Sequence, residues 1–228
     1  GTGTQTGLVV GFFNHDTLEH VVAVKRGTVL QPQNERTQSM LIARNTLPSR
    51  GKLGFTSCRA EWVASKSAPV YQFTLPPRQL TRIPLNAVCA ELEKNPPAAE
   101  HIPCSMTPPP SGSDLEKLFL GVDKINNHDV PEIEKAIVHR DSTGYRLNRP
   151  LTEREQIILN NLTEGGFLSY NTLNYAVWAL TDSLDKNRMT AKLQEWSGLD
   201  ASPSFNVQIE MTRILLEEAG LPAYAEKF

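Results

Sequence analysis

The sequence predicts an α+β protein in which an N-terminal small antiparallel β-barrel or sandwich with one covering helix precedes a C-terminal all-α bundle. Up to residue 94 the apolar residues form short β-branched or aromatic runs, whereas from residue 114 they recur with helical spacing. In residues 95–113, six of nineteen residues are proline, which fixes φ and removes a backbone donor. The predicted domains are a β-rich module (1–94), an extended Pro-rich linker (95–113) and a helical module (114–228).

The predicted strands of the β-rich module are short runs bounded by turn residues. Five or six strands at this spacing are typical of a small barrel or sandwich. The runs are Leu8–Phe13, His20–Lys25, Thr28–Leu30, Met40–Arg44, Leu53–Val63 and Val70–Leu75.

The covering helix is predicted after Pro84, a residue that the first turn of a helix tolerates. Leu85, Val88, Cys89 and Leu92 follow at positions i, i+3, i+4 and i+7 and would form one apolar face. We expect this helix to cover an open end or face of the sheet.

In the helical module, capping signals mark the predicted helix starts. Ser113 with Glu116 and Thr152 with Glu155 fit the capping box, and Pro203 opens a later helix. The central helix is expected from Ser169 or Asn171 to Leu184, because this run is apolar on most sides. The module should contain five or six helices.

Between the first two caps, residues 126–128 predict a helix break, and a second helix should begin near Pro131. His139 would then lie at the C-terminus of that helix, where its charge favours the helix dipole. Residues 141–150 are polar and predict a loop.

Charge is unevenly distributed along the chain. Residues 1–110 contain eleven Lys and Arg against seven Asp and Glu, whereas residues 111–228 contain twelve against eighteen. A mildly basic module and an acidic one suggest different partners. No run approaches the length of a membrane span, no signal peptide is visible, and the three cysteines form no disulfide framework. These features indicate an intracellular protein with reduced thiols and no membrane partner.

Basic and aromatic residues of the β-rich module suggest a surface for single-stranded nucleic acid, because aromatic rings stack on bases and cations follow the phosphates. The alternative is that the rings fill the core and the cations are merely solvated; the modest charge of the module favours it. The candidate residues are Lys25, Arg26, Arg44, Arg50, Lys52, Arg59, Phe55 and Trp62.

The sequence predicts no catalytic residues, no metal site and no cofactor. His15, Asp16, Glu19 and His20 flank a predicted turn but lack a known ligand spacing. No nucleophile, metal or phosphate-binding motif occurs in a suitable context.

Aromatic residues of the helical module are candidate anchors for a protein partner, since an exposed Tyr or Trp commonly dominates an interface. They are Tyr170, Tyr175, Trp178 and Trp196. The alternative is a plain core. The predicted function is that of a non-catalytic interaction or assembly protein, with the acidic helical module docking a protein partner or a second copy. The first alternative is a nucleic-acid-associated accessory factor, and the second is an enzyme whose site forms no sequence motif.

Overall fold

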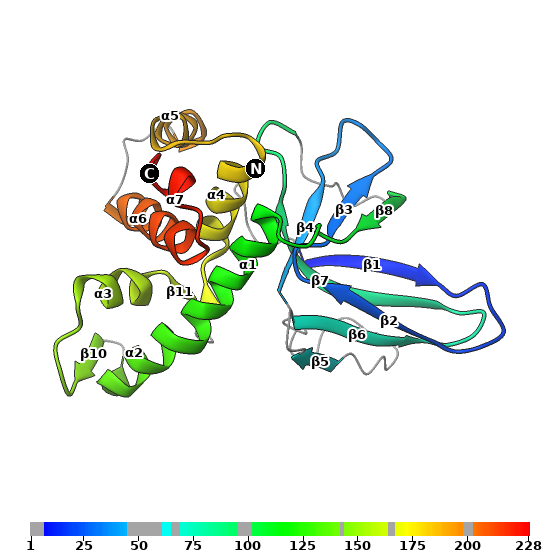
Figure 1. Cartoon of the computed structure of the whole chain (residues 1–228), viewed down its shortest axis with the longest axis horizontal. Helices are drawn as coiled ribbons and strands as arrows, with labels where there is room; N and C mark the ends of the chain where they lie inside the picture. Colours follow the sequence, from blue (N-terminus) through cyan, green and yellow to red (C-terminus); the bar gives the residue numbers. More distant parts are fainter. Residues whose placement is uncertain are drawn as a thin grey trace. The chain divides into compact units, whose positions relative to one another are not determined.

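The computed structural model describes residues 7–44, 61–64, 69–94, 102–141, 144–163, 167–197 and 203–228, with the backbone alone for some of them. The chain divides into two compact units, a β unit that ends at Glu116 and a helical unit, Lys117–Phe228 (Figure 1). The protein is of mixed α+β class, as predicted, and its described sheets are small and antiparallel.

The β unit contains two antiparallel sheets. One has five strands in the order β1-β7-β4-β3-β8, and the other has three in the order β2-β6-β5. Among the described strands no sheet closes into a barrel, so the barrel alternative is not observed. The strands are β1 (Gly7–Phe13), β2 (His20–Lys25), β3 (Val29–Pro32), β4 (Met40–Arg44), β5 (Glu61–Ala64), β6 (Pro69–Leu75), β7 (Leu80–Cys89) and β8 (Cys104–Thr107).

The two sheets share one hydrophobic core. Alternate residues of each strand point to one face, and the inward set of β1 includes Val10, which is buried, and Phe12, whose ring lies 4.9 Å from that of Phe73. The fully buried members of this core come from both sheets: Val10, Val24, Leu30, Met40, Ile42, Phe73, Leu75, Ile83, Leu85 and Ala87.

Most predicted strands of this unit are confirmed. The bounds of β2 and β4 agree with the prediction, and β1, β3 and β6 differ by one or two residues. Of the run predicted over residues 53–63, only the part from Glu61 lies within the described residues. Within the Pro-rich segment, β8 pairs with β3 as an edge strand, so four of its residues extend the sheet.

The predicted covering helix is wrong, because residues 80–89 form strand β7 between β1 and β4. Pro84 lies opposite Val9 and, since β4 pairs only with the last four residues of β7, it has a single strand neighbour within the part of the chain that the structure describes. A proline is tolerated in such a place because no ladder donor is needed on its open side. Pairing with two strands distant in sequence therefore overrides the local helical spacing.

The helical unit also contains two small hairpins, which corrects the expectation of an all-α bundle. They pair β9 with β10 and β11 with β12. The elements are α1 (Asp114–Lys124), the π-helical turn η1 (Ile125–Asp129), α2 (Val130–Ala136), β9 (Ile137–Asp141), β10 (Gly144–Leu147), α3 (Glu153–Asn160), β11 (Leu162–Thr163), β12 (Phe167–Leu168), α4 (Tyr170–Thr181), α5 (Lys186–Ser197), α6 (Pro203–Glu218) and α7 (Pro222–Ala225).

The predicted break at residues 126–128 is instead a π-helical turn, so the chain stays helical from α1 into α2. The N–H of Val130 donates to the carbonyl of Ile125, five residues back. Pro131 follows, and a proline in a regular helix clashes with the carbonyl four residues earlier. The wider turn gives that carbonyl room, which explains why the helix survives the proline.

Helix α2 ends earlier than predicted, because the chain returns and caps it. Asn148 binds its last carbonyls, with its backbone N–H on Ala136 at 2.9 Å and its side-chain amide on Lys135 at 2.9 Å. The β-branched residues after Ala136 then form β9, and the predicted loop over residues 141–150 contains strand β10. His139 is therefore a strand residue and not a helix C-terminal one.

The predicted capping box is complete at one site and partial at the other. Thr152 and Glu155 form a reciprocal capping box at the start of α3. Ser113 accepts the backbone N–H of Glu116, but the carboxylate of Glu116 accepts the N–H of Gly112 and not that of Ser113. At both sites the hydroxyl satisfies an N–H that the first helical turn leaves without a partner.

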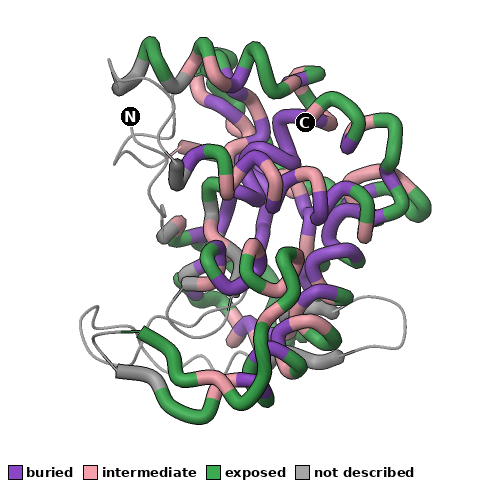
Figure 2. Tube along the Cα trace, turned by 90° about the vertical axis from the view of Figure 1, so that its left-hand side faces the viewer, coloured by how far each residue is buried: buried purple, intermediate pink, exposed green. Residues whose placement is uncertain are grey.

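Helix α4 is the most buried helix of the described unit, as expected for its central element. Residues 172–179 are all buried, and Figure 2 shows such stretches gathered inside the helical unit. A satisfied polar network crosses this core: Asn161 donates to the carbonyl of Val207 at 3.2 Å and accepts the hydroxyl of Thr172 at 3.1 Å. Arg154 links two further elements through Asp129 and Glu218.

Candidate functional site

The structure describes the side chains of only two of the predicted nucleic-acid residues, Lys25 and Arg26, so the predicted surface stays a prediction. Lys25 is exposed at the end of β2, and Arg26 follows it half-buried. For Arg44 of β4 and Trp62 of β5 the structure describes the backbone alone. The other candidates lie outside the described residues: Arg50, Lys52, Phe55 and Arg59.

Two of the predicted aromatic anchors of the helical unit belong to its core. Tyr175 and Trp178 of α4 are only 5% and 6% exposed. Tyr175 packs near Phe205, and its hydroxyl donates to Gln208 at 3.2 Å. Tyr170 and Trp196 lie in α4 and α5, but their side chains are outside the described part of the structure.

Each histidine near the first turn interacts with one other side chain, His20 with Asp16 and His15 with Phe13. His20 Nε2 lies 2.7 Å from a carboxylate oxygen of Asp16, and both side chains are largely exposed. The ring of His15 packs 4.6 Å from that of Phe13. Across the described residues, no group of three or more His, Cys, Asp or Glu side chains could hold a metal ion.

An exposed apolar surface lies instead on β1 and β7, which run antiparallel along their full shared length (Figure 1). Phe13 faces Leu80 across the two strands, and the two side chains are 48% and 51% exposed. Val9, on the same face of β1, is 42% exposed. We call Val9, Phe13 and Leu80 the apolar face.

Gly11 and Arg82 complete this face between the apolar residues. They pair directly across the strands, and Arg82 is exposed. A Cβ on Gly11 would meet Cδ1 of Leu80 at 3.3 Å, so the leucine side chain extends over the glycine. The face is therefore a shallow apolar surface with one cation beside it, a composition suited to contact with another protein.

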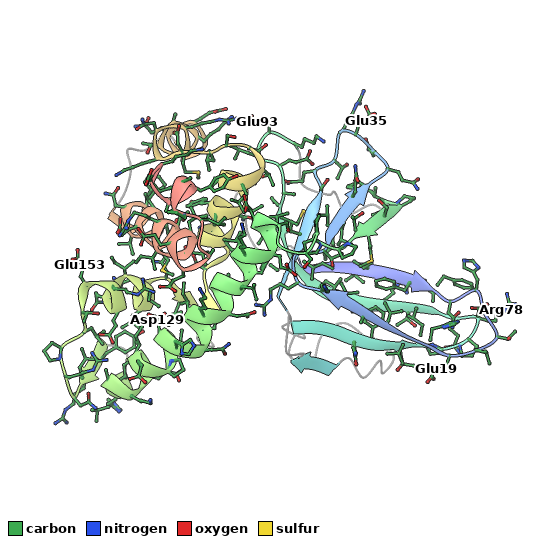
Figure 3. The ribbon with its side chains drawn as sticks, viewed as in Figure 1. Glu19, Glu35, Arg78, Glu93, Asp129 and Glu153 are labelled. Carbon is green, nitrogen blue, oxygen red and sulfur yellow. The ribbon has the colours of Figure 1, made fainter. Side chains whose placement is uncertain are left out.

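Asn14 holds the end of the apolar face in place. Its buried side-chain amide donates to the carbonyls of Leu18 at 2.8 Å and Leu75 at 3.0 Å, and its side-chain oxygen accepts the N–H of Asp16 at 2.9 Å. These bonds join the β1–β2 connection to the end of β6. Figure 3 shows Glu19 and Arg78 of the two connections at this same end of the unit.

A further exposed apolar residue lies in the adjoining connection. Leu18 of the β1–β2 connection is 70% exposed, whereas Val21, 68% exposed, belongs to β2 of the other sheet and is not part of the apolar face. Exposed apolar residues that occur singly are ordinary, whereas a contiguous group indicates an interaction site. The cross-strand pair of Phe13 and Leu80, with Val9 on the same face and Leu18 exposed in the adjoining connection, makes this end of the β unit the strongest candidate.

Sequence reasoning missed this face because β1 is apolar on both faces. Leu8, Val10 and Phe12 alternate with Val9, Gly11 and Phe13, a pattern typical of a strand that is buried on both faces. Nothing in the run itself distinguishes the inward residues from the outward ones. The turn residues 14–16 indicate only where the strand ends.

Comparisons with models of protein families, with curated proteins and with solved structures found no significant match to this chain. Within the described residues, no helix combines the length and the apolar character that crossing a bilayer requires. The site must therefore be interpreted from its own chemistry.

Proposed function

We propose that this is a non-catalytic interaction or assembly protein and that it holds a protein partner on the apolar face of its β unit. The cross-strand pair of Phe13 and Leu80 carries the proposal, because two large apolar residues directly opposite each other on paired strands are each about half exposed. Interfaces concentrate their binding energy in such residues, with aromatic residues enriched among them.

The proposed contact surface differs from the one expected on the helical unit. Tyr175 and Trp178 are buried there and offer a partner little surface. The exposed residues of the helical unit that remain large and apolar, among those described, are Leu120, Val138 and Tyr145, and none is on α4. The β unit therefore has the better support as the contact surface.

Photo-cross-linking at Leu80 tests the proposal. A benzoyl-phenylalanine in place of Leu80 should capture a partner, whereas the same group in place of Val21, an exposed valine of the other sheet, should capture much less of it. The captured protein is then purified, and its dissociation constant is measured for the wild-type chain and for Leu80→Lys. We expect the substitution to weaken binding at least about fivefold. Equal affinity for both chains would refute the proposal.

Binding of single-stranded nucleic acid through the basic side chains of the β unit is the alternative. Its specific support is Arg82, a cation exposed beside the Phe13–Leu80 pair. Fluorescence anisotropy with a labelled single-stranded oligonucleotide separates the two functions. Binding that falls steeply with salt, and that Arg82→Ala weakens more than Leu80→Lys does, would favour the alternative.

A further inference from the structure

Among the described residues, the outer edge of β1 pairs with no other strand. In the five-stranded sheet β1 is a terminal strand, and β7 is its only strand neighbour among the described residues. An open edge presents a row of N–H and C=O groups that another strand can bind. Short strands, charges and prolines usually block such an edge, but β1 is seven residues long and contains neither a charge nor a proline.

The hydrogen-bond pattern shows which residues present these groups. The N–H of Asn14 donates to the carbonyl of Gln79 at 3.2 Å, one step beyond the Phe13–Leu80 pair. Bonded and non-bonded pairs alternate in an antiparallel ladder, so Val9, Gly11 and Phe13 occupy non-bonded positions opposite β7. Their N–H and C=O groups therefore point toward the open edge.

We propose that a second copy of this chain pairs with β1, antiparallel, about a two-fold axis at Val10. This inference goes beyond the proposed function, because the second copy binds the open edge of β1 and leaves the Phe13–Leu80 pair to a different protein. The axis makes the contact isologous, so the same strand serves both copies and the assembly closes as a dimer. The five-stranded sheets of the two copies would then join into one continuous sheet.

The sequence of β1 is self-complementary in this register. Val9 of one copy lies opposite Gly11 of the other, and Phe13 lies opposite Gly7. Each large outward side chain therefore meets a glycine, an arrangement in which the larger residue covers the glycine. Gly7 also occupies a non-bonded position opposite β7, so Gly7, Val9, Gly11 and Phe13 all enter hydrogen-bonded pairs with the second copy. These four pairs give about eight main-chain bonds, because each pair exchanges two.

Shifted registers use less of the strand. An axis at Val9 pairs only residues 7–11, and an axis at Gly11 pairs only residues 9–13, so each leaves two residues of β1 outside the contact. The absence of charge within β1 also means that no like charges meet when the strand pairs with itself. Both considerations favour the axis at Val10.

The first measurement is sedimentation velocity on the full chain over the micromolar range. The wild type should form a dimer. Val9→Lys puts one cation on β1 of each copy, so the dimer contact would contain two. The substitution should raise the dissociation constant of the dimer about tenfold or more. Val21→Lys is the matched control, because it makes the same change at an exposed valine of the other sheet. Leu80→Lys alters the apolar face one strand away from the edge. Both controls should change the constant less than about threefold.

The second measurement tests the register by disulfide trapping under a glutathione redox buffer. In Val10→Cys the two thiols would lie across the axis in a non-bonded pair, within disulfide reach, and mass spectrometry should find the peptide linked to itself. Leu8→Cys is the control: the two positions would be on the order of 14 Å apart and should not link.

A wild-type chain that stays monomeric throughout, or a dimer that responds equally to Val9→Lys and Leu80→Lys, overturns the inference. Trapping at position 8 in preference to position 10 overturns the register and with it the proposed axis. These failures are distinct from failure of the proposed function, because a monomer whose Leu80 site still captures another protein keeps that function and loses only the self-pairing. Circular dichroism of each variant confirms that the fold is retained.

Discussion

Gly121 of α1 and Ala219, which follows α6, approach so closely that a Cβ on Gly121 would lie 2.9 Å from backbone and side-chain atoms of Ala219. Real Cβ atoms do not come so near to backbone, and a backbone cannot move aside as a flexible side chain can. Within an isolated helix a glycine only weakens the helix. In the structure it lets two helical segments of the same unit come into contact, and both residues are buried.

We expect Gly121→Ala to lower the free energy of unfolding by about 1–3 kcal/mol, because the added methyl group overpacks this contact. In an ordinary exposed helix the same change would instead stabilise by about 1 kcal/mol. Urea denaturation followed by circular dichroism gives the sign directly. Leu120→Ala, at the neighbouring exposed position, is the control and should have a smaller effect. A stabilising Gly121→Ala would contradict the close approach.

Asn14→Ala should destabilise the β unit by about 2–3 kcal/mol, because the buried bond to the carbonyl of Leu75 and the partly buried bond to the carbonyl of Leu18 would both be lost. The control is Asn34→Ala, which removes an exposed side-chain bond to the N–H of Arg36 and should cost well under about 1 kcal/mol. Denaturation midpoints measure both. Equal losses would show that the bonds of Asn14 do not hold the turn.

The acid stability of the helical unit should depend on Glu155. Hydrogen bonds from the guanidinium of Arg149, at 2.7 and 2.5 Å, and from the backbone N–H of Thr152 lower the pKa of this carboxylate from 4.5 to about 2. Because the folded-state pKa is lowered, the stabilisation is complete above pH about 4.5 and is lost as the pH falls toward about 2.

Glu155→Gln should therefore weaken the unit at neutral pH and flatten its stability profile between these two pH values. Thermal unfolding as a function of pH measures this. The matched control is Glu153→Gln, which removes a charge from the same helical turn but none of the capping contacts. If both variants follow the wild-type profile equally, Glu155 has no special role in acid stability.

The hydroxyl of Tyr175 should ionise at a higher pH than that of an ordinary exposed tyrosine. Burial raises its pKa from 10.0 to about 12. Burial favours the neutral phenol, so its contribution to stability is present below pH about 10 and is lost as the pH rises toward about 12. In an ultraviolet absorbance titration, Tyr175→Phe should remove a step near pH 12 while leaving earlier steps unchanged. Loss of a step near pH 10 instead would contradict the burial.

Local patterns predicted the elements whose signals lie within a few residues. His20–Lys25 is a β-branched run between turn residues, and Thr152 with Glu155 is a cap that needs only one helical turn. The segment after Pro84 could not be predicted in this way, because its structure depends on β1 and β4, which lie some forty to eighty residues away along the chain. Its residues satisfy helical spacing, and only strand pairing decides against it.

The candidate site was harder to predict than the fold, for a related reason. Val9, Val10, Phe12 and Phe13 are of similar residue types, yet Val10 is buried and Phe13 is half exposed. Exposure depends on which face of the sheet the second sheet covers, and no local pattern carries that information. For the same reason, Tyr175 and Trp178 could be recognised as aromatic but not as buried.

The π-helical turn before Pro131 also sets the phase of the long helical segment. Val122 before the turn and Ile125 at its first residue are buried, and Val130 and Ile133 are buried after it. The step from Ile125 to Val130 is five residues, and in a regular α-helix each extra residue would rotate the following side chains by about 100°. The wide turn absorbs this additional residue, so both apolar stripes continue along one side of the segment. Deleting one of the two asparagines that precede His128 would thus keep Val130 and Ile133 on the buried side, because Ile125 and Val130 would then be four residues apart in a regular α-helix. The same deletion would remove the wide turn and bring the ring of Pro131 against the carbonyl four residues before it.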